Sequence, residues 1–337
     1  MLKKDFPDHL LGMQSLTRNA IDLIFQRANN FLDNIKENLV FNTLQGQVVA
    51  NLFFETSTRT RNSFEIAEKR LGAIVLNPDL KVSALDKGES LLDMAQNLQA
   101  MGTNFFVIRH TKNNQPRMLA EHLKQGIVIN AGDGNNQHPT QGLIDLMTIQ
   151  QHKPDWTKLC VTIIGDIYHS RVANSLVDGL LIMGVPEIRI TGPSQLLPKI
   201  FNNQRIKKFS TLEESLINTD VVVTLRLQKE RHSNLIDLNT FRQLFGLSAE
   251  KFALAKPDAI LMHPGPINRE IEITSELADG KQSVILEQVK NGVAIRMAVL
   301  ELLFLSRSQT KIERSKHNTN NLTTHVDYPT FLPWTVP

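Results

Sequence analysis

Short apolar runs and longer helical patterns alternate along the chain in two series. The first series has apolar runs near residues 48–54, 73–76, 104–108 and 127–129, and the second has them near 160–165, 187–191, 220–225 and 259–262. Segments between the runs carry apolar residues at helical spacing, as in residues 90–101. Strands that alternate with helices form parallel sheets with right-handed crossovers. The pattern therefore predicts an α/β fold with two doubly wound parallel-sheet domains.

Two further helical patterns and one break fix the expected domain boundaries. Residues 15–36 carry apolar side chains on one helical side, and residues 292–306 predict a last helix that returns to the first domain. The polar segment 150–155 interrupts the pattern between the two series. We therefore expect a first domain over residues 1–150, completed by the helix near 292–306, and a second domain over 151–291. Residues 307–337 form a polar tail that is either disordered or a docking segment.

Composition narrows the class of protein. A chain of 337 residues suits two domains, and 41% hydrophobic with 21% charged residues is typical of soluble globular proteins. The net charge of +3 and the lack of a long basic run give no case for nucleic-acid binding. Cys160, the one cysteine, lies in an apolar run and is interpreted as a buried structural residue, so neither a disulfide framework nor a Cys/His metal cluster is expected. Without a leader or a membrane-length apolar segment, we expect a cytoplasmic protein with no membrane contact.

The most informative segment follows the first apolar run. That run leads directly into Ser57-Thr58-Arg59-Thr60-Arg61, and Phe64, Ala67 and Leu71 then recur at helical spacing. A helix N-terminus has free N–H groups and a positive dipole, so arginines are disfavoured there unless an anion occupies the site. We interpret the segment as a phosphate cradle. In the alternative interpretation Ser57 only caps the helix and Arg61 pairs with Glu65, which leaves Arg59 unexplained.

Polar and basic residues also follow most of the other predicted strands. Ligands of open α/β sheets bind beyond the carboxyl ends of the strands, so one site in the cleft between the two domains is the simplest interpretation. The candidates are Arg109 after the third run, His138 and Gln141 after the fourth, Arg171 after the fifth, Arg226 and Gln228 after the seventh, and Gly265 and Pro266 after the eighth. Lys87, in a polar loop with Ser83, is a weaker candidate because a solvated loop lysine is equally compatible with this composition.

These side chains favour charge stabilisation over acid–base chemistry. Five cations accompany hydroxyl, amide and imidazole groups, whereas no carboxylate pair, Ser-His-Asp order or metal cluster joins them. Such a site suits polyanionic substrates and a reaction that builds negative charge, and it needs no cofactor. Only Gly165 stands where a dinucleotide-binding protein carries Gly-x-Gly-x-x-Gly, which disfavours a nicotinamide dehydrogenase.

Five motifs, in order, resemble those of the aspartate and ornithine carbamoyltransferase family over residues 5–306. Residues 57–61 resemble its carbamoyl-phosphate signature, and residues 138–141, 170–172, 226–231 and 263–266 resemble the aspartate branch. An ornithine enzyme would show His-Pro-Cys-Gln at 138–141 and His-Cys-Leu-Pro at 263–266. The resemblance implies transfer of the carbamoyl group of carbamoyl phosphate to L-aspartate, giving N-carbamoyl-L-aspartate and phosphate in pyrimidine biosynthesis. The alternatives are another amine, such as ornithine, or a catalytically silent assembly subunit.

The resemblance also implies a role for each matched residue. Ser57, Thr58, Arg59 and Thr60 would hold the phosphate, and Arg109 would contact phosphate and the carbonyl oxygen. Thr60 and His138 would polarise the carbonyl, Gln141 would fix the carbamoyl amide, and the backbone at Gly265 and Pro266 would complete this site. Arg171, Arg226, Gln228 and Lys87 would bind aspartate.

The same resemblance implies an assembly. Ser83 and Lys87 would come from a neighbouring chain, which requires a homotrimer with shared active sites. Asp86 stands where some family members carry a second basic residue, so Lys87 would be the sole cation of that loop. The sequence leaves open whether a regulatory or dihydroorotase-like partner chain joins the trimer.

Overall fold

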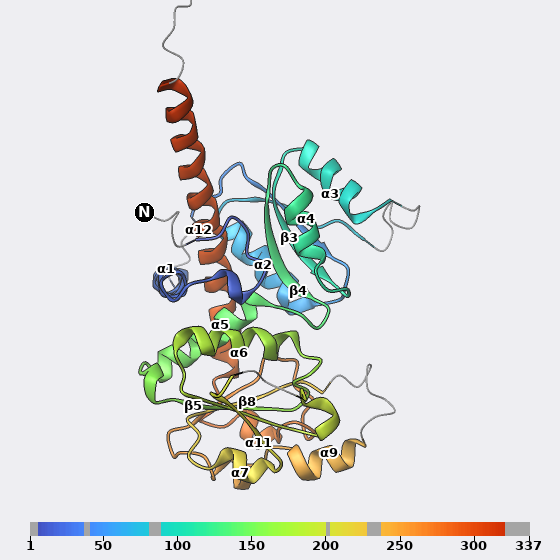
Figure 1. Ribbon diagram of the computed structural model, residues 1–337, viewed down its shortest axis with the longest axis vertical. Helices are drawn as coiled ribbons and strands as arrows, with labels where there is room; N and C mark the ends of the chain where they lie inside the picture. The colour runs from blue at the N-terminus through green and yellow to red at the C-terminus, as the bar shows by residue number, and fades with distance from the viewer. Residues whose placement is uncertain (1–5, 37–40, 81–88, 200–202, 228–236, 321–337) are drawn as a thin grey trace, which may run out of the picture.

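The computed structural model describes residues 6–36, 41–80, 89–199, 203–227 and 237–320. The chain forms two lobes, each built around a parallel sheet (Figure 1). The first lobe contains α1 (Arg18–Lys36), β1 (Val48–Phe53), α2 (Thr58–Arg70), β2 (Ile74–Leu76), α3 (Leu91–Ala100), β3 (Thr103–His110), α4 (Gln115–His122), β4 (Ile127–Asp133) and α5 (Pro139–His152). The fold class predicted from the sequence is confirmed.

The second lobe follows a single turn of 3-10 helix. It contains β5 (Cys160–Ile164), α6 (Arg171–Met183), β6 (Glu187–Thr191), β7 (Ile206–Phe209), α7 (Leu212–Leu216), β8 (Val221–Thr224), α9 (Leu238–Phe245), α10 (Ala249–Phe252), β9 (Ile260–Met262) and α11 (Ser275–Ala278). The long helix α12 (Ile285–Asn320) then closes the described chain. Among all the described residues of both lobes, no helix combines the length and apolar character that a membrane crossing requires.

Strand order places a topological switch point in each sheet. The first sheet has the order β2-β1-β3-β4 and the second β7-β6-β5-β8-β9, and every pairing between these strands is parallel. The order therefore reverses between β1 and β3 in one sheet and between β5 and β8 in the other. In open α/β sheets the ligand crevice lies at such a point, outside the carboxyl ends of the strands.

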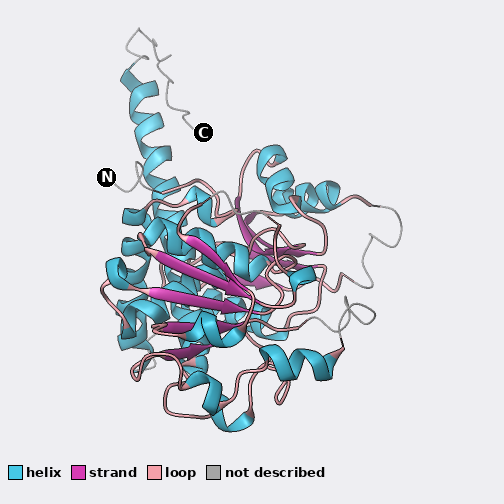
Figure 2. Cartoon of the chain, turned by 60° about the horizontal axis from the view of Figure 1, so that its bottom comes forward, coloured by secondary structure: helices cyan, strands magenta, loops and turns pink. Residues whose placement is uncertain are grey.

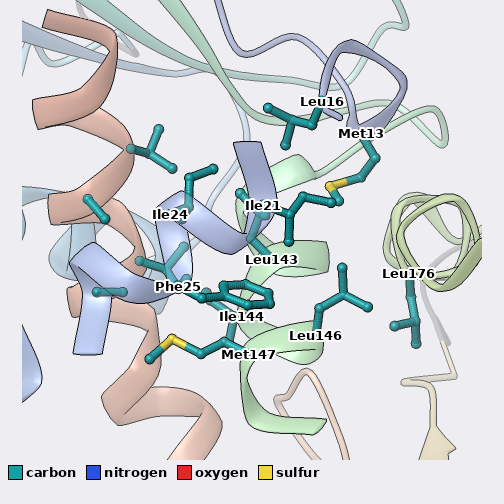
Figure 3. Close-up of a cluster of buried hydrophobic side chains, with 14 of the residues drawn as sticks. Met13, Leu16, Ile21, Ile24, Phe25, Leu143, Ile144, Leu146, Met147 and Leu176 are labelled. Atoms are coloured by element: carbon teal, nitrogen blue, oxygen red, sulfur yellow. The ribbon is translucent and has the colours of Figure 1, made fainter. Parts of the chain in front are cut away.

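One continuous apolar core runs through both lobes. It packs one face of the first sheet, through Phe105 and Val107, and one face of the second, through Val161 and Ile163. Figure 3 shows its middle part, where side chains of α1, α5 and α6 meet. Separate clusters cover the outer faces of the two sheets, so helices lie on both sides of each sheet (Figure 2).

The last helix is longer than predicted and packs on the first lobe. It begins at Ile285 rather than near residue 292 and continues through Asn320, so residues 307–320 extend the helix. It packs against α1, α2 and α5. The early start was hidden because two polar residues in the first turns are buried: Gln288 and Asn291 bond to side chains of α5.

Candidate active site

The predicted phosphate cradle lies at the start of α2. Ser57 is the N-cap residue, but its side chain makes no capping hydrogen bond, so the interpretation that Ser57 only caps the helix is wrong. Thr58 and Arg59 are exposed, whereas Thr60 is buried. Hydroxyl groups and free backbone N–H groups at this turn are therefore available to an anion.

Arg59 reaches across to the loop that follows β9. Its Nη2 donates to the carbonyl oxygen of Pro264 over 3.3 Å. Gly265 has a φ of +69°, and a Cβ built there would lie 1.9 Å from Arg59 Nη1, so a side chain at this position would displace the guanidinium. The next peptide bond, Gly265–Pro266, is cis. Burial, and then the charge of Arg226, lowers the pKa of Arg59, so the arginine that follows β8 lies close enough to act on the charge of Arg59.

A second pair of arginines meets on one carboxylate. Arg109 Nη2 donates to Glu55 Oε1 over 2.9 Å, and Arg171 donates to Glu55 Oε1 and Oε2 over 2.6 and 3.0 Å. Although burial alone would raise the pKa of Glu55, its bonds to Arg171 and Arg109 lower it. Glu55 and Arg109 belong to the first lobe and Arg171 begins α6 in the second, so this carboxylate joins the lobes.

Glycine makes room for this pair too. A Cβ on Gly132, which has a φ of +118°, would lie 3.0 Å from Arg109 Nη1 and 3.0 Å from Arg171 Nε. A side chain at residue 132 would therefore crowd both guanidinium groups and would be strained at this φ.

His138 is the N-cap of α5, directly before Pro139, as predicted. It is 3% exposed, and its backbone N–H donates to Ser175 Oγ of α6 over 2.8 Å. Burial, and then the charges of Arg109, Arg296 and Arg171, lowers its pKa well below the usual value. The imidazole is therefore neutral at physiological pH and offers one N–H donor and one acceptor.

Behind His138 and Gln141 lies a set of buried polar side chains. Gln141 Nε2 donates to Asp145 Oδ1 over 2.9 Å, and Gln288 Nε2 donates to the same oxygen over 2.8 Å. Arg296 of α12 is also buried; its guanidinium lies 4.8 Å from the ring centre of Phe64 and donates to the carbonyl of Gly292. Burial lowers the pKa of Arg296 to about 9.

Comparison with known families identifies the family of the chain. Residues 8–151 match the family described as "Aspartate/ornithine carbamoyltransferase, carbamoyl-P binding domain", and residues 157–303 match "Aspartate/ornithine carbamoyltransferase, Asp/Orn binding domain". The chain belongs to the aspartate/ornithine carbamoyltransferase family. The resemblance inferred from five motifs is therefore confirmed.

Individual relatives within this carbamoyltransferase family are close. The chain is 65% identical over 302 residues to the aspartate carbamoyltransferase catalytic subunit of Coxiella burnetii (strain Dugway 5J108-111), covering 89% of this chain and 97% of the relative. Among solved structures, aspartate transcarbamoylase from Trypanosoma cruzi in complex with carbamoyl aspartate and phosphate is 28% identical with a TM-score of 0.80, covering 89% of this chain and 97% of that one. The ligand-free form of the same enzyme gives a TM-score of 0.76 at 27% identity, covering 89% and 96%.

Several of the predicted carbamoyltransferase residues interact. Arg59 contacts the loop at Gly265 and its pKa is lowered by the charge of Arg226, while Arg109 and Arg171 share Glu55 and lower the pKa of His138. The predicted residues Ser83, Lys87 and Gln228 lie outside the described part of the chain, as does Asp86. Cys160 is buried, and burial raises the pKa of its thiol, which agrees with a structural residue.

Sequence reasoning missed Glu55, Asp145 and Arg296. Glu55 stands beside the phosphate motif, but its two partners come from residues 54 and 116 positions away. Asp145 follows Gln141 at the i, i+4 spacing of an amide–carboxylate pair, which is a signal that could have been used. Arg296 interrupts the apolar pattern of the last helix, and a charge within such a stripe indicates a buried polar contact.

Proposed function

We propose that the chain catalyses transfer of the carbamoyl group of carbamoyl phosphate to the amine of L-aspartate, giving N-carbamoyl-L-aspartate and phosphate in de novo pyrimidine synthesis. The observation that carries this function is that arginines from the two switch points pair across the lobes. Arg109 and Arg171 share Glu55 and lower the pKa of the buried His138, and the charge of Arg226 acts on Arg59. Two small polyanions need this concentration of cations. The identity to a curated relative of this activity supports the assignment.

Carbamoyl phosphate is assigned to the first lobe. Ser57, Thr58, Arg59 and Thr60 hold its phosphate with hydroxyl groups, N–H groups and one guanidinium, because the start of α2 favours an anion. Arg109 contacts phosphate and the carbonyl oxygen. The backbone at Gly265 and Pro266 closes the carbamoyl site next to Arg59.

The chemical step requires charge stabilisation and a proton acceptor. The lone pair of the aspartate amine attacks the carbonyl carbon, and the C=O electrons move to oxygen, where Thr60, Arg109 and His138 stabilise the oxyanion. When the C=O bond re-forms, the bond to the phosphate oxygen breaks and phosphate leaves with the electron pair, neutralised by Arg59. An oxygen of the departing phosphate takes the amine proton, so no separate base is needed.

L-Aspartate is assigned to the second lobe, with Arg171, Arg226, Gln228 and Lys87 binding its carboxylates. Residues 1–150 with the returning last helix then form the carbamoyl-phosphate domain, and residues 151–291 form the aspartate domain. The descriptions of the two family matches support this division. Arg171 is paired with Glu55, so the carboxylate of aspartate shares this guanidinium with Glu55 or displaces Glu55 from it.

Comparing amines tests the proposal. Purified protein should release phosphate from carbamoyl phosphate with L-aspartate, whereas L-ornithine should give no turnover above background. Turnover of ornithine alone would overturn the choice of amine. No turnover with either amine by a folded, trimeric preparation, alone or with regulatory or dihydroorotase-like chains, would favour the silent assembly subunit. The cytoplasmic location expected from the sequence stays a prediction.

We further propose a homotrimer in which Ser83 and Lys87 enter the neighbouring site. Mixing chains that carry Arg59→Ala with chains that carry Lys87→Ala tests this directly. Some sites of a mixed trimer then contain neither substitution, so activity should recover from two inactive parents. If each chain has a complete site of its own, mixing restores nothing and the shared-site proposal is wrong.

A further inference from the structure

α5, α12 and the loop after β9 are connected by three buried residues, Asp145, Gln288 and His263. Asp145, which is 0% exposed, accepts from Gln141 on the same helix and from Gln288 of α12, both through Oδ1. Gln288 is 3% exposed, and its Oε1 accepts from the backbone N–H of His263 over 3.0 Å. The carboxylate thus lies behind Gln141, away from solvent, while Gln141 itself is partly exposed.

This arrangement fixes which end of each amide faces the carboxylate. A backbone N–H can only donate, so the atom of Gln288 that meets His263 must be its oxygen, and its NH₂ must face Asp145. An unprotonated carboxylate oxygen only accepts, so the same holds for Gln141. The Gln141 oxygen is therefore not bonded to Asp145 and stays an acceptor.

We propose that Asp145 is a positioning residue that makes Gln141 an acceptor and thereby selects a carbamoyl group over an acetyl group. The inference deepens the proposed function, in which Gln141 faces the carbamoyl amide. The carbamoyl NH₂ donates to Gln141 Oε1, whereas a methyl group of the same size leaves that oxygen without a partner. Once the bound ligand covers this oxygen, leaving it unpaired reduces affinity by roughly 10- to 100-fold.

Asp145 keeps this role when it carries a proton. Burial raises its pKa to about 7, against the effect of its bonds to Gln141 and Gln288. Its second oxygen, Oδ2, has no hydrogen-bond partner among the described residues. A proton on Oδ2 leaves Oδ1 free to accept from both amides, so the orientation of Gln141 is retained.

The Asp145 carboxylate is also connected, through Gln288 and His263, to the loop after β9 that contacts Arg59. His263, held by Gln288, accepts through Nδ1 from the N–H of Gly265 over 2.7 Å, and this loop contacts Arg59. Because Gln288 bonds to both Asp145 and His263, it retains one partner when the other is lost. Removal of Asp145 should therefore affect Gln141 more than Arg59.

Two variants separate the acceptor from the shape of the side chain. Asp145→Asn keeps an Oδ1 acceptor for both amides and places its NH₂ where Oδ2 has no partner. Asp145→Leu has nearly the same shape and removes the acceptor. The dissociation constants of carbamoyl phosphate, acetyl phosphate and inorganic phosphate are then measured by calorimetry on each purified, assembled protein.

We expect Asp145→Leu to lower the preference for carbamoyl over acetyl phosphate by about 10- to 100-fold, with inorganic phosphate binding little changed. Asp145→Asn should restore most of the preference. Should the leucine variant fail to fold, Asp145→Ser, whose hydroxyl is too short to reach Gln141, should show the same loss.

Two results would overturn the inference: an unchanged preference in the acceptor-less variant, or an equal loss for all three ligands, which is the signature of general damage. These binding measurements do not require transfer to aspartate. A wild-type protein that binds carbamoyl phosphate selectively but does not carbamoylate aspartate would refute the proposed function and leave the role of Asp145 intact.

Discussion

His138 illustrates at the scale of one residue how burial selects a chemical role. A protonated imidazole would add a cation next to Arg109, Arg171 and Arg296, and removal from water makes that charge more costly. The residue is therefore neutral. In the proposed reaction the arginines supply the charge, and His138, at the start of α5, supplies a hydrogen-bond donor.

The first prediction separates these contributions. His138→Ala should lower kcat by about 10²–10³-fold, because one oxyanion donor is lost, while the dissociation constant of phosphate changes little. Since its pKa lies well below 6.5, the wild-type kcat should show no step from His138 between pH 6.5 and 8. Steady-state kinetics and calorimetry measure both effects. His122→Ala, on the exposed surface of α4, is the control, and near-normal turnover of His138→Ala would contradict the assigned role.

The second prediction concerns Gly265. Alanine there would place a Cβ against Arg59 Nη1 and would keep a positive φ, which costs an L-residue roughly 1–2 kcal/mol. We expect weaker phosphate binding as well as lower stability. Gly102→Ala is a matched control, because Gly102 has a φ of +96° with no atom within 4 Å of the added Cβ. It should lose stability alone; equal phosphate affinity in both variants would contradict the contact with Arg59.

Site residues could be predicted from the sequence where they follow the end of a strand. The strand pattern identified Arg59, Arg109 and His138 in this way in the first sheet and Arg171 in the second. The residues that bond to them could not be predicted. The two arginines that meet on Glu55 are brought together by the packing of the two lobes, and no local pattern contains that information.

At the scale of elements, the sequence predicted apolar strands well and polar ones poorly. β7 was missed because Lys207 and Lys208 interrupt it, as is usual for a strand at the edge of a sheet. β4 was expected to end at residue 129, where the apolar run stops. It continues because Asn130 is buried and donates to the carbonyl of Leu11 and to Asp133.

Helix α2 contains a titratable group whose effect on stability can be predicted. Glu68 is 0% exposed and its Oε2 accepts from Asn51 Nδ2 over 2.8 Å, while its Oε1 has no hydrogen-bond partner in the part of the chain that the structure describes. Burial raises its pKa from 4.5 to about 8. The folded state therefore holds a proton that the unfolded state releases above its lower pKa, so this group makes the protein less stable as pH rises from about 4.5 to 8.

Glu68→Gln should remove this slope. It should raise the free energy of unfolding at pH 9 relative to the wild type and have a smaller effect at pH 5, because the wild-type carboxyl is protonated there. Each pH unit within the window corresponds to at most ~1.4 kcal/mol. Urea titrations at several pH values measure the difference. Glu65→Gln, on the same helix but paired with Lys69, should leave the slope in place; a parallel shift at all pH values in Glu68→Gln would contradict the assignment.

At the scale of the whole molecule, the two lobes share one apolar core, but each has its own sheet, with its own strand-end loops. α5 and α12 contribute to the continuous core, and α12 packs back on α1 and α2. The two switch points then meet at the side where the strand-end loops lie. Glu55 is an ionic link across this side, since its carboxylate holds Arg109 of one lobe and Arg171 of the other.

The last prediction follows from this double role of Glu55. Glu55→Gln removes a negative charge beside two guanidinium groups, so phosphate should bind at least as tightly as to the wild type. The same change turns one of the two acceptor oxygens that hold Arg109 and Arg171 into an NH₂ donor, which faces a guanidinium group and disturbs their alignment. Misplacement of about 1 Å costs on the order of 10² in rate. We therefore expect a lower kcat with undiminished phosphate affinity.

Glu121→Gln, on the exposed side of α4, is the control and should change neither quantity. A parallel loss of rate and phosphate affinity would mean that Glu55 supports the fold of the lobe, whereas a normal rate would mean that the arginines keep their alignment without it.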